Sequence, residues 1–244
     1  MRNWLKGILA ATIALSATTL WAQLVASDDA DDAVYNDGWQ LTDNGGFGLN
    51  PWYEISAGGG GRFIATAPFQ VLAGNRSWGL FAGNGNYAIG RPLQTPRDSG
   101  VFSVLARHNV NNEVGFTGIA VYSGASEVIR FGLNPSSGNQ AVFYQFGANT
   151  GSIDFFGTEL RGARLRYALT WDSSGNFTLV VANLGGPQVG VAFGNWGSGV
   201  SVSAFGFLNF NSGSFQDLIF DKIEVVPEPA SMLALGAGLA GLLA

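Results

Sequence analysis

Apolar and polar side chains alternate along much of the chain. Residues 165–171 (LRYALTW) carry an apolar side chain at every second position, and residues 177–181 (FTLVV) resume the alternation after the sequence DSSGN. A period of two is that of a β-strand with one buried face, and a short polar segment between two such runs is typical of a hairpin turn. This segment therefore predicts a β-hairpin.

The same pattern extends over most of the chain. Residues 102–106, 114–122 and 142–146 also alternate, and turn sequences rich in Gly, Asn, Ser and Pro lie between such runs. No segment between residues 27 and 226 keeps a helical period over three turns. The 36 glycines disfavour helices further, since each costs about 1 kcal/mol relative to Ala in a helix interior. The pattern predicts an all-β domain, either a sandwich or a barrel.

The N-terminus differs from this domain. Arg2 and Lys6 precede an uncharged, largely apolar run over residues 7–22, as in a secretory signal peptide. Small residues at Ala22 and Ala26 offer two cleavage positions, so we expect residues 1–26 to hold a signal helix and the β domain to span residues 27–226. The alternative is a buried N-terminal helix.

The C-terminus differs as well. Pro227-Glu228-Pro229 follows a strand-like run, and two prolines so close together end a sheet. Residues 230–244 carry no charge and predict a short apolar helix, about 22 Å long at 1.5 Å per residue. A bilayer core of about 30 Å prefers nearer 20 residues, so this helix is short for a membrane span.

Residues 226–231 (VPEPAS), together with the apolar run after them, resemble the PEP-CTERM sorting signal. The resemblance implies that Pro227, Glu228 and Pro229 form the sorting motif, and that an exosortase processes the tail after it enters the inner membrane. It also implies a Gram-negative-type bacterium that makes exopolysaccharide, with the protein at the cell surface or outside the cell. The family's signal ends in a basic cluster, whereas no Arg or Lys follows the apolar run here. The β domain in turn resembles the jelly-roll or concanavalin-like antiparallel sandwiches common in this group.

The composition of the chain limits the kinds of site that it can form. The chain has no Cys and one His, which excludes thiol chemistry and makes a zinc site improbable. Its net charge of −5 disfavours nucleic acid as a partner. Asp28, Asp29, Asp31 and Asp32 crowd into five residues, and carboxylates are ligands of calcium. No known calcium-loop spacing is met, so the alternative is a solvated acidic approach to the first strand.

Catalytic patterns are weak. No G-x-S-x-G motif is present, the glutamates are isolated, and His108 sits at the end of a predicted strand, where a structural or surface role fits it best. We therefore expect a protein that is not an enzyme: a non-catalytic surface or matrix protein, or alternatively a lectin-like module that binds exopolysaccharide with or without calcium. Trp171 belongs to a predicted core face. Trp78 and Trp196 lie in Gly-, Asn- and Ser-rich segments and are candidates to stack on sugar rings, or else to cap the ends of the domain.

Overall fold

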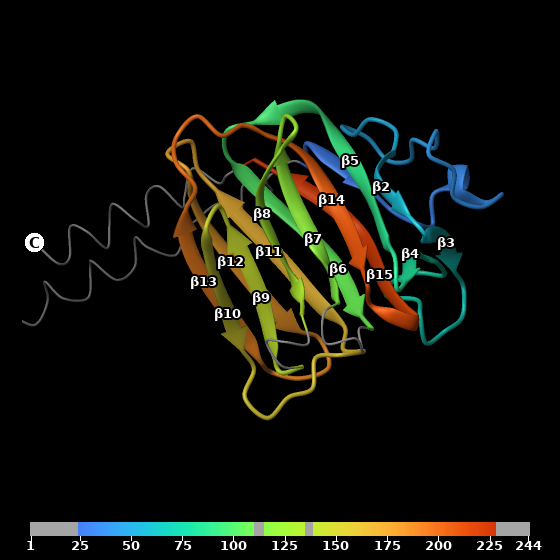
Figure 1. Cartoon of the computed structure of the whole chain (residues 1–244). Helices are drawn as coiled ribbons and strands as arrows, with labels where there is room; N and C mark the ends of the chain where they lie inside the picture. The colour runs from blue at the N-terminus through green and yellow to red at the C-terminus, as the bar shows by residue number, and fades with distance from the viewer. Residues whose placement is uncertain (1–23, 110–114, 135–138, 228–244) are drawn as a thin grey trace, which may run out of the picture.

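The computed structural model describes residues 24–109, 115–134 and 139–227. They form two antiparallel sheets packed face to face (Figure 1). The first sheet runs in the order β13 (Val189–Asn195), β12 (Asn176–Asn183), β11 (Leu165–Trp171), β6 (Gly100–His108), β15 (Gly213–Val226), β4 (Ser77–Gly83) and β3 (Gly61–Ala65), with β1 (Ala26–Asp28) beside β15. The all-β domain predicted from the alternation is confirmed, and of the two alternatives it is a sandwich.

The second sheet covers the first. Its order is β10 (Asn149–Asp154), β9 (Ala141–Phe146), β8 (Ser126–Leu133), β7 (Phe116–Ser123), β14 (Val202–Phe210), β5 (Asn86–Arg97) and β2 (Tyr53–Gly58). A 3₁₀ turn, η1 (Ala33–Tyr35), is the helical element among the described residues. In the part of the chain that the structure covers, no helix has both the length and the apolar character needed to span a membrane.

The predicted hairpin is present as β11 and β12. Leu165 pairs with Asn183 and Trp171 with Phe177 across an antiparallel register, and the turn between them holds Gly175 at φ +81°. Burial alternates strictly along β11, with the apolar positions facing inward. The period of two in the sequence is thus the period of the buried face.

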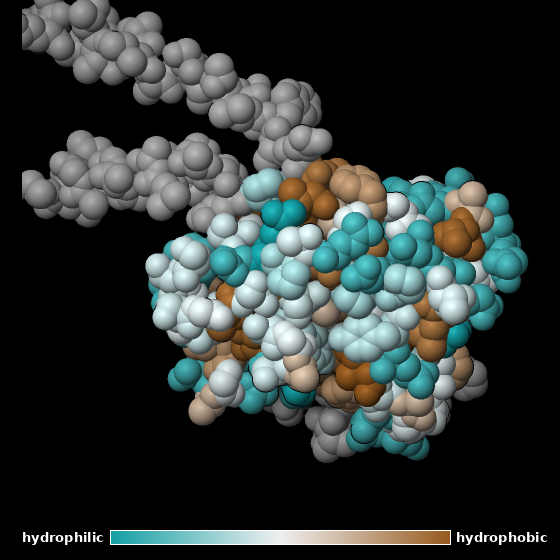
Figure 2. Space-filling model, turned by 90° about the horizontal axis from the view of Figure 1, so that it is seen from above, coloured by the Kyte–Doolittle hydropathy of each residue, from teal (hydrophilic) through white to brown (hydrophobic). Residues whose placement is uncertain are grey.

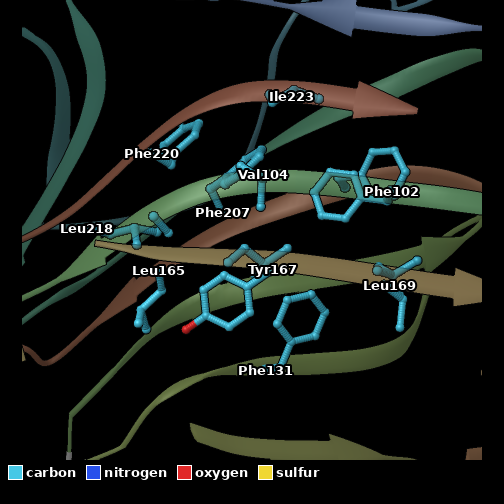
Figure 3. Packing of buried hydrophobic residues seen from close by; sticks show 14 of the residues in the cluster. Phe102, Val104, Phe131, Leu165, Tyr167, Leu169, Phe207, Leu218, Phe220 and Ile223 are labelled. Atoms are coloured by element: carbon cyan, nitrogen blue, oxygen red, sulfur yellow. The ribbon is translucent and has the colours of Figure 1, made fainter. Parts of the chain in front are cut away.

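Aromatic rings join the two sheets through the core. Phe102 of β6 stacks on Phe205 of β14 at 4.0 Å, and Phe207 of β14 stacks on Phe220 of β15 at 3.8 Å between ring centroids. Figure 3 shows Phe207 and Phe220 among the side chains that fill the space between the sheets. Such pairs contribute about 0.5–1.5 kcal/mol beyond the area that they bury, so they align the sheets as well as fill the core.

The sandwich begins before residue 27, which corrects the predicted boundary. The Val25 amide donates a hydrogen bond to the Val225 carbonyl at 2.8 Å, and Ala26 pairs with Val225 and is fully buried. Ala26 is therefore part of the fold. At the other boundary, β15 ends at Val226 and Pro227 is exposed, as predicted.

Candidate functional site

A hollow of about 440 Å³ lies at one end of the sandwich. Three connections form it: the turn between β7 and β8, the turn between β9 and β10, and the loop from β13 to β14. These connections lie at the upper end of the molecule in Figure 1. Gly124, Gly147, Gly197 and Gly199 all have positive φ there, which lets the backbone turn tightly enough to leave the space open.

Trp196 is the aromatic residue of the β13–β14 loop and lines this hollow. Its ring stacks on Phe177 at 5.1 Å, and Phe177 meets Phe146 edge-on at 5.0 Å, so a row of rings from the core supports it. The Trp196 amide donates to the Gly175 carbonyl at 2.9 Å, which fixes the loop. The indole Nε1 is buried and has no hydrogen-bond partner. Trp196 is therefore a rigid ring with an unused donor.

Polar side chains surround the ring. The Asn195 amide nitrogen donates to Asn176 Oδ1 at 2.7 Å, and its oxygen accepts from the Gly197 amide, so Asn195 stabilises the loop. Asn149 and Ser198 are exposed at the rim. Seen from this end of the molecule in Figure 2, small apolar patches are separated by hydrophilic and weakly polar residues. The hollow thus combines two aromatic side chains, Trp196 and Phe146, with several hydrogen-bonding groups.

Glu127 is the one acidic side chain lining the hollow. It receives two hydrogen bonds from Arg130, at 2.5 and 3.1 Å, in a forked ion pair. Burial, followed by the nearby Glu127, raises the pKa of Tyr122 to about 12, so that phenol stays neutral. A neutralised carboxylate of this kind is a hydrogen-bonding group more than a base.

Trp78, the other candidate for sugar stacking, is not at a surface. It lies in β4, is fully buried, and packs edge-on against Tyr35 at 5.4 Å and Trp52 at 5.3 Å. The prediction of a ligand-binding loop residue is wrong, because Trp78, Leu80 and Ala82 form the inward face of a strand. Their alternation was visible in the sequence and could have placed Trp78 in the core. Trp171 is fully buried, as predicted.

The four N-terminal aspartates are held by protein groups. Asp28 is buried and pairs with Arg91 at 2.5 Å, while Tyr35 donates to it at 2.7 Å. Asp31 lies 3.7 Å from Arg76, Asp32 accepts from the Gly46 amide, and Asp29 pairs with Lys222. The expectation of a solvated acidic approach is wrong for the buried Asp28, while the other three aspartates stay partly exposed; their contacts fasten residues 24–50 to both sheets. Across the described ranges, no cluster of His, Cys, Asp or Glu could hold a metal ion.

His108 is structural, as expected from its place at a strand end. It is fully buried, and its Nδ1 lies 3.0 Å from Thr117 Oγ1 and its Nε2 2.8 Å from the Tyr167 hydroxyl. Burial lowers its pKa to about 3, so the ring is neutral at physiological pH. The imidazole therefore bridges β6 and β7, one strand from each sheet.

The predicted terminal signals fall mostly outside the described residues. Pro227 is the last residue described, while Glu228, Pro229, the apolar tail and residues 1–23 lie beyond them. The sorting motif and the signal helix stay predictions. No protein-family model and no curated protein matches the sequence.

Solved structures resemble the fold. The globular domain of calreticulin from T. cruzi aligns with a TM-score of 0.53 and 11% identity, over 90% of this chain and 94% of that one. An endo-β-1,4-glucuronan lyase from the fungus Trichoderma reesei gives 0.52 and 13%, over 84% and 96%. Lectin II from Ulex europaeus gives 0.50 and 9%, over 79% and 97%. At these identities the likeness is one of architecture: a two-sheet antiparallel sandwich of lectin-like type.

Proposed function

We propose that this protein is an exported, non-catalytic surface protein whose sandwich binds carbohydrate in the hollow beside Trp196. The observation that carries the proposal is the combination in one hollow of a half-buried, supported indole ring with amide and hydroxyl groups at the rim. Apolar faces of sugar rings stack on aromatic rings, while their hydroxyl groups need donors and acceptors in fixed positions.

The dimensions of the hollow fit this use. Its volume of about 440 Å³ is within the range of about 300–1,000 Å³ usual for small-ligand sites. Phe177 behind Trp196 holds the indole plane without a ligand, so little side-chain entropy is lost on binding.

The carboxylates favour binding over cleavage. Glycoside hydrolysis uses two carboxyl groups about 5–10 Å apart, one on each side of the scissile bond. Glu127 stands alone in the lining and is occupied by Arg130. The arrangement supports recognition of a sugar chain, so we propose that the protein is not an enzyme.

Export and sorting form the second part of the proposal. The predicted signal peptide at residues 1–26 and the Pro227-Glu228-Pro229 motif support passage through the inner membrane and processing by an exosortase. At the C-terminal end of β15, Val226 pairs with Val101 at the start of β6. The neighbouring Gly100 pairs with Trp171, the last residue of β11, and the turn that follows β11 contacts Trp196. Pro227, the last residue described, therefore lies at the end of the domain that bears the hollow.

Glycan binding by the purified protein tests the first part. Trp196→Ala should weaken binding to a glycan array or to immobilised exopolysaccharide by about ten-fold, since a ring stack of about 1–1.5 kcal/mol is lost. Phe156→Ala is the matched control, because Phe156 is 88% exposed and lies outside the lining. Equal binding by Trp196→Ala and the parent would refute the site. Repeating the measurement with calcium and with a chelator tests whether calcium assists.

Export is tested separately. Residues 1–30 fused to a reporter that is active only after export should yield signal, and retention in the cytoplasm would exclude the export proposal. Replacing Pro227, Glu228 and Pro229 together with alanine should abolish tail processing in a host that makes an exosortase. Unchanged processing would remove the sorting proposal while leaving the sugar site untouched.

A further inference from the structure

Three arginines gather on the outward face of the first sheet. Arg107 lies near the end of β6, and Arg164 and Arg166 lie at the start of β11. Leu165 pairs with Ala106, and Arg166 pairs with Leu105, so the register places Arg164 opposite Arg107. Like charges directly opposite each other on neighbouring strands destabilise a sheet. Arg107 and Arg164 form such a pair of like charges in this sandwich.

Most other basic side chains in the described chain have partners. Ion pairs join Arg76 to Asp31, Arg91 to Asp28, Arg130 to Glu127, Arg161 to Glu159 and Lys222 to Asp29. Arg62 donates to the Trp39 carbonyl and the Tyr87 hydroxyl instead. Among the described residues, no ion pair and no hydrogen bond involves the side chains of Arg97, Arg107, Arg164 or Arg166, and of these four Arg107 and Arg164 lie opposite each other on paired strands. In a chain with more acids than bases, two facing arginines without an acid are an electrostatic anomaly.

The Arg107 guanidinium also contains an orphaned donor. Its Nε is buried and has no hydrogen-bond partner. Burial first, and the charge of Arg164 second, lower the pKa of this arginine. A buried donor left unpaired in a native structure needs an explanation, and an absent ligand is one.

A second hollow opens beside these arginines. It has a volume of about 540 Å³ and lies between Arg164 and the segment of residues 66–75. Leu72 of that segment packs with Leu105 and Ile219 on the outward face of the sheet, which holds the segment in place. Thr66 and Asn75 add polar groups to the wall. Arg164 thus borders a cavity large enough for a sugar residue, and Arg107 lies opposite Arg164 on the neighbouring strand.

We propose that Arg107 and Arg164 bind the carboxylate or sulfate group of an acidic polysaccharide whose sugar ring occupies this second hollow. Guanidinium groups pair with such oxyanions in a forked geometry, and an anion placed between the two would remove their mutual repulsion.

The charge of the rest of the molecule favours a polysaccharide over other polyanions. With a net charge of −5, the protein would be repelled by an extended phosphate surface such as nucleic acid or an anionic bilayer. A polysaccharide in which neutral sugars separate the acidic groups presents one anionic group at a time to the hollow and is repelled less by the rest of the molecule. The site is also separate from the hollow beside Trp196, because Arg107 lies near the end of β6 and Gly100, next to Trp171, lies at its start.

Affinity electrophoresis of the purified protein tests the proposal. Polygalacturonate carries carboxylates, dextran sulfate carries sulfates and dextran is neutral, so the three probes distinguish the anionic groups. We expect at least one of the charged polymers to retard the protein, and the combined Arg107→Gln and Arg164→Gln variant to bind it about ten-fold more weakly. Arg97→Gln removes the same charge from β5, in the other sheet, and should bind like the parent.

Stability provides a second measurement. Because the substitutions remove a repulsion, the double variant should melt at the same temperature as the parent or higher. A melting temperature lowered by several degrees would instead show that the arginines serve the fold, and would overturn the proposal. So would unchanged binding by the double variant, equal loss in Arg97→Gln, or binding to phosphatidylglycerol vesicles without binding to either charged polymer. Trp196→Ala should leave this binding intact, so the proposed site at Trp196 and the proposed site at Arg107 and Arg164 can be confirmed or refuted separately.

Discussion

The buried His108 makes a specific prediction about stability and pH. Its pKa is about 3 in the folded protein and about 6.5 in an unfolded chain, because burial penalises the charged ring. As pH falls below 6.5, the unfolded state takes up a proton that the folded state refuses. The contribution of the neutral ring to stability is therefore complete above pH 6.5 and is lost progressively as pH falls toward 3.

The size of the loss follows from the two pKa values. At pH 5 the unfolded histidine is protonated, 1.5 units below its pKa of about 6.5, while the folded one is still mostly neutral. At about 1.4 kcal/mol per unit, this difference lowers the free energy of unfolding by about 2 kcal/mol relative to pH 7.5. Asp28 and Asp221 act in the opposite direction, since burial raises the pKa of each carboxyl to about 6. The total stability of the protein can therefore hide the histidine effect, but a comparison of two variants cancels the aspartates.

His108→Gln supplies that comparison. Glutamine can hydrogen-bond to Thr117 and Tyr167 in part but does not titrate, so the variant should be about 1–2 kcal/mol less stable than the parent at pH 7.5. Its disadvantage should shrink by about 2 kcal/mol at pH 5, roughly 4–8 °C in melting temperature for a domain of this size. Urea unfolding followed by tryptophan fluorescence measures both differences. A gap that is the same at both pH values would refute the assignment of a buried, neutral His108.

Three further predictions concern the N-terminal segment. Asp28→Asn should cost about 3–5 kcal/mol, because it leaves Arg91 buried without a counter-charge; a loss below about 1 kcal/mol in urea unfolding would show that the pair is dispensable. Gly46→Ala should cost more than about 2 kcal/mol, since φ is +66° there and a Cβ would lie 1.8 Å from the Ser27 carbonyl oxygen; an unchanged melting temperature would contradict this geometry. The mature N-terminus should follow Ala22, which keeps β1 complete, and N-terminal sequencing that finds Ser27 first would show that β1 forms without Ala26.

The local pattern of apolar and polar residues predicted much of the fold. The alternation over residues 165–171 and 177–181 predicted a hairpin that the structure contains, because one buried face imposes the same period on sequence and strand. The end of the last strand before Pro227 was equally local, since proline cannot continue a sheet ladder. The absence of Cys and the presence of one His limited the available chemistry through composition alone.

Trp78 and Trp196 mark the limit of local pattern. Both lie among Gly, Asn and Ser in the sequence, yet one is fully buried in β4 and the other lines a hollow at the end of the sandwich. Which side of a strand faces the second sheet is settled only when the sheets pack. For Trp78 the alternation with Leu80 was a local signal, whereas for Trp196 the neighbours that form the site come from β7–β8 and β9–β10, distant in sequence.

The pairing of charged residues depended most on the tertiary structure. Asp28 is 63 residues from Arg91, and Arg107 is brought opposite Arg164 only by the pairing of β6 with β11. A run of aspartates gives the same local pattern whether it is solvated, binds a metal or fastens a segment, because the pattern does not contain the partner. The sequence by itself determined that this is an all-β chain with distinctive ends; the packing of two sheets decided which charges are paired, which ring is accessible and which two arginines are left facing each other.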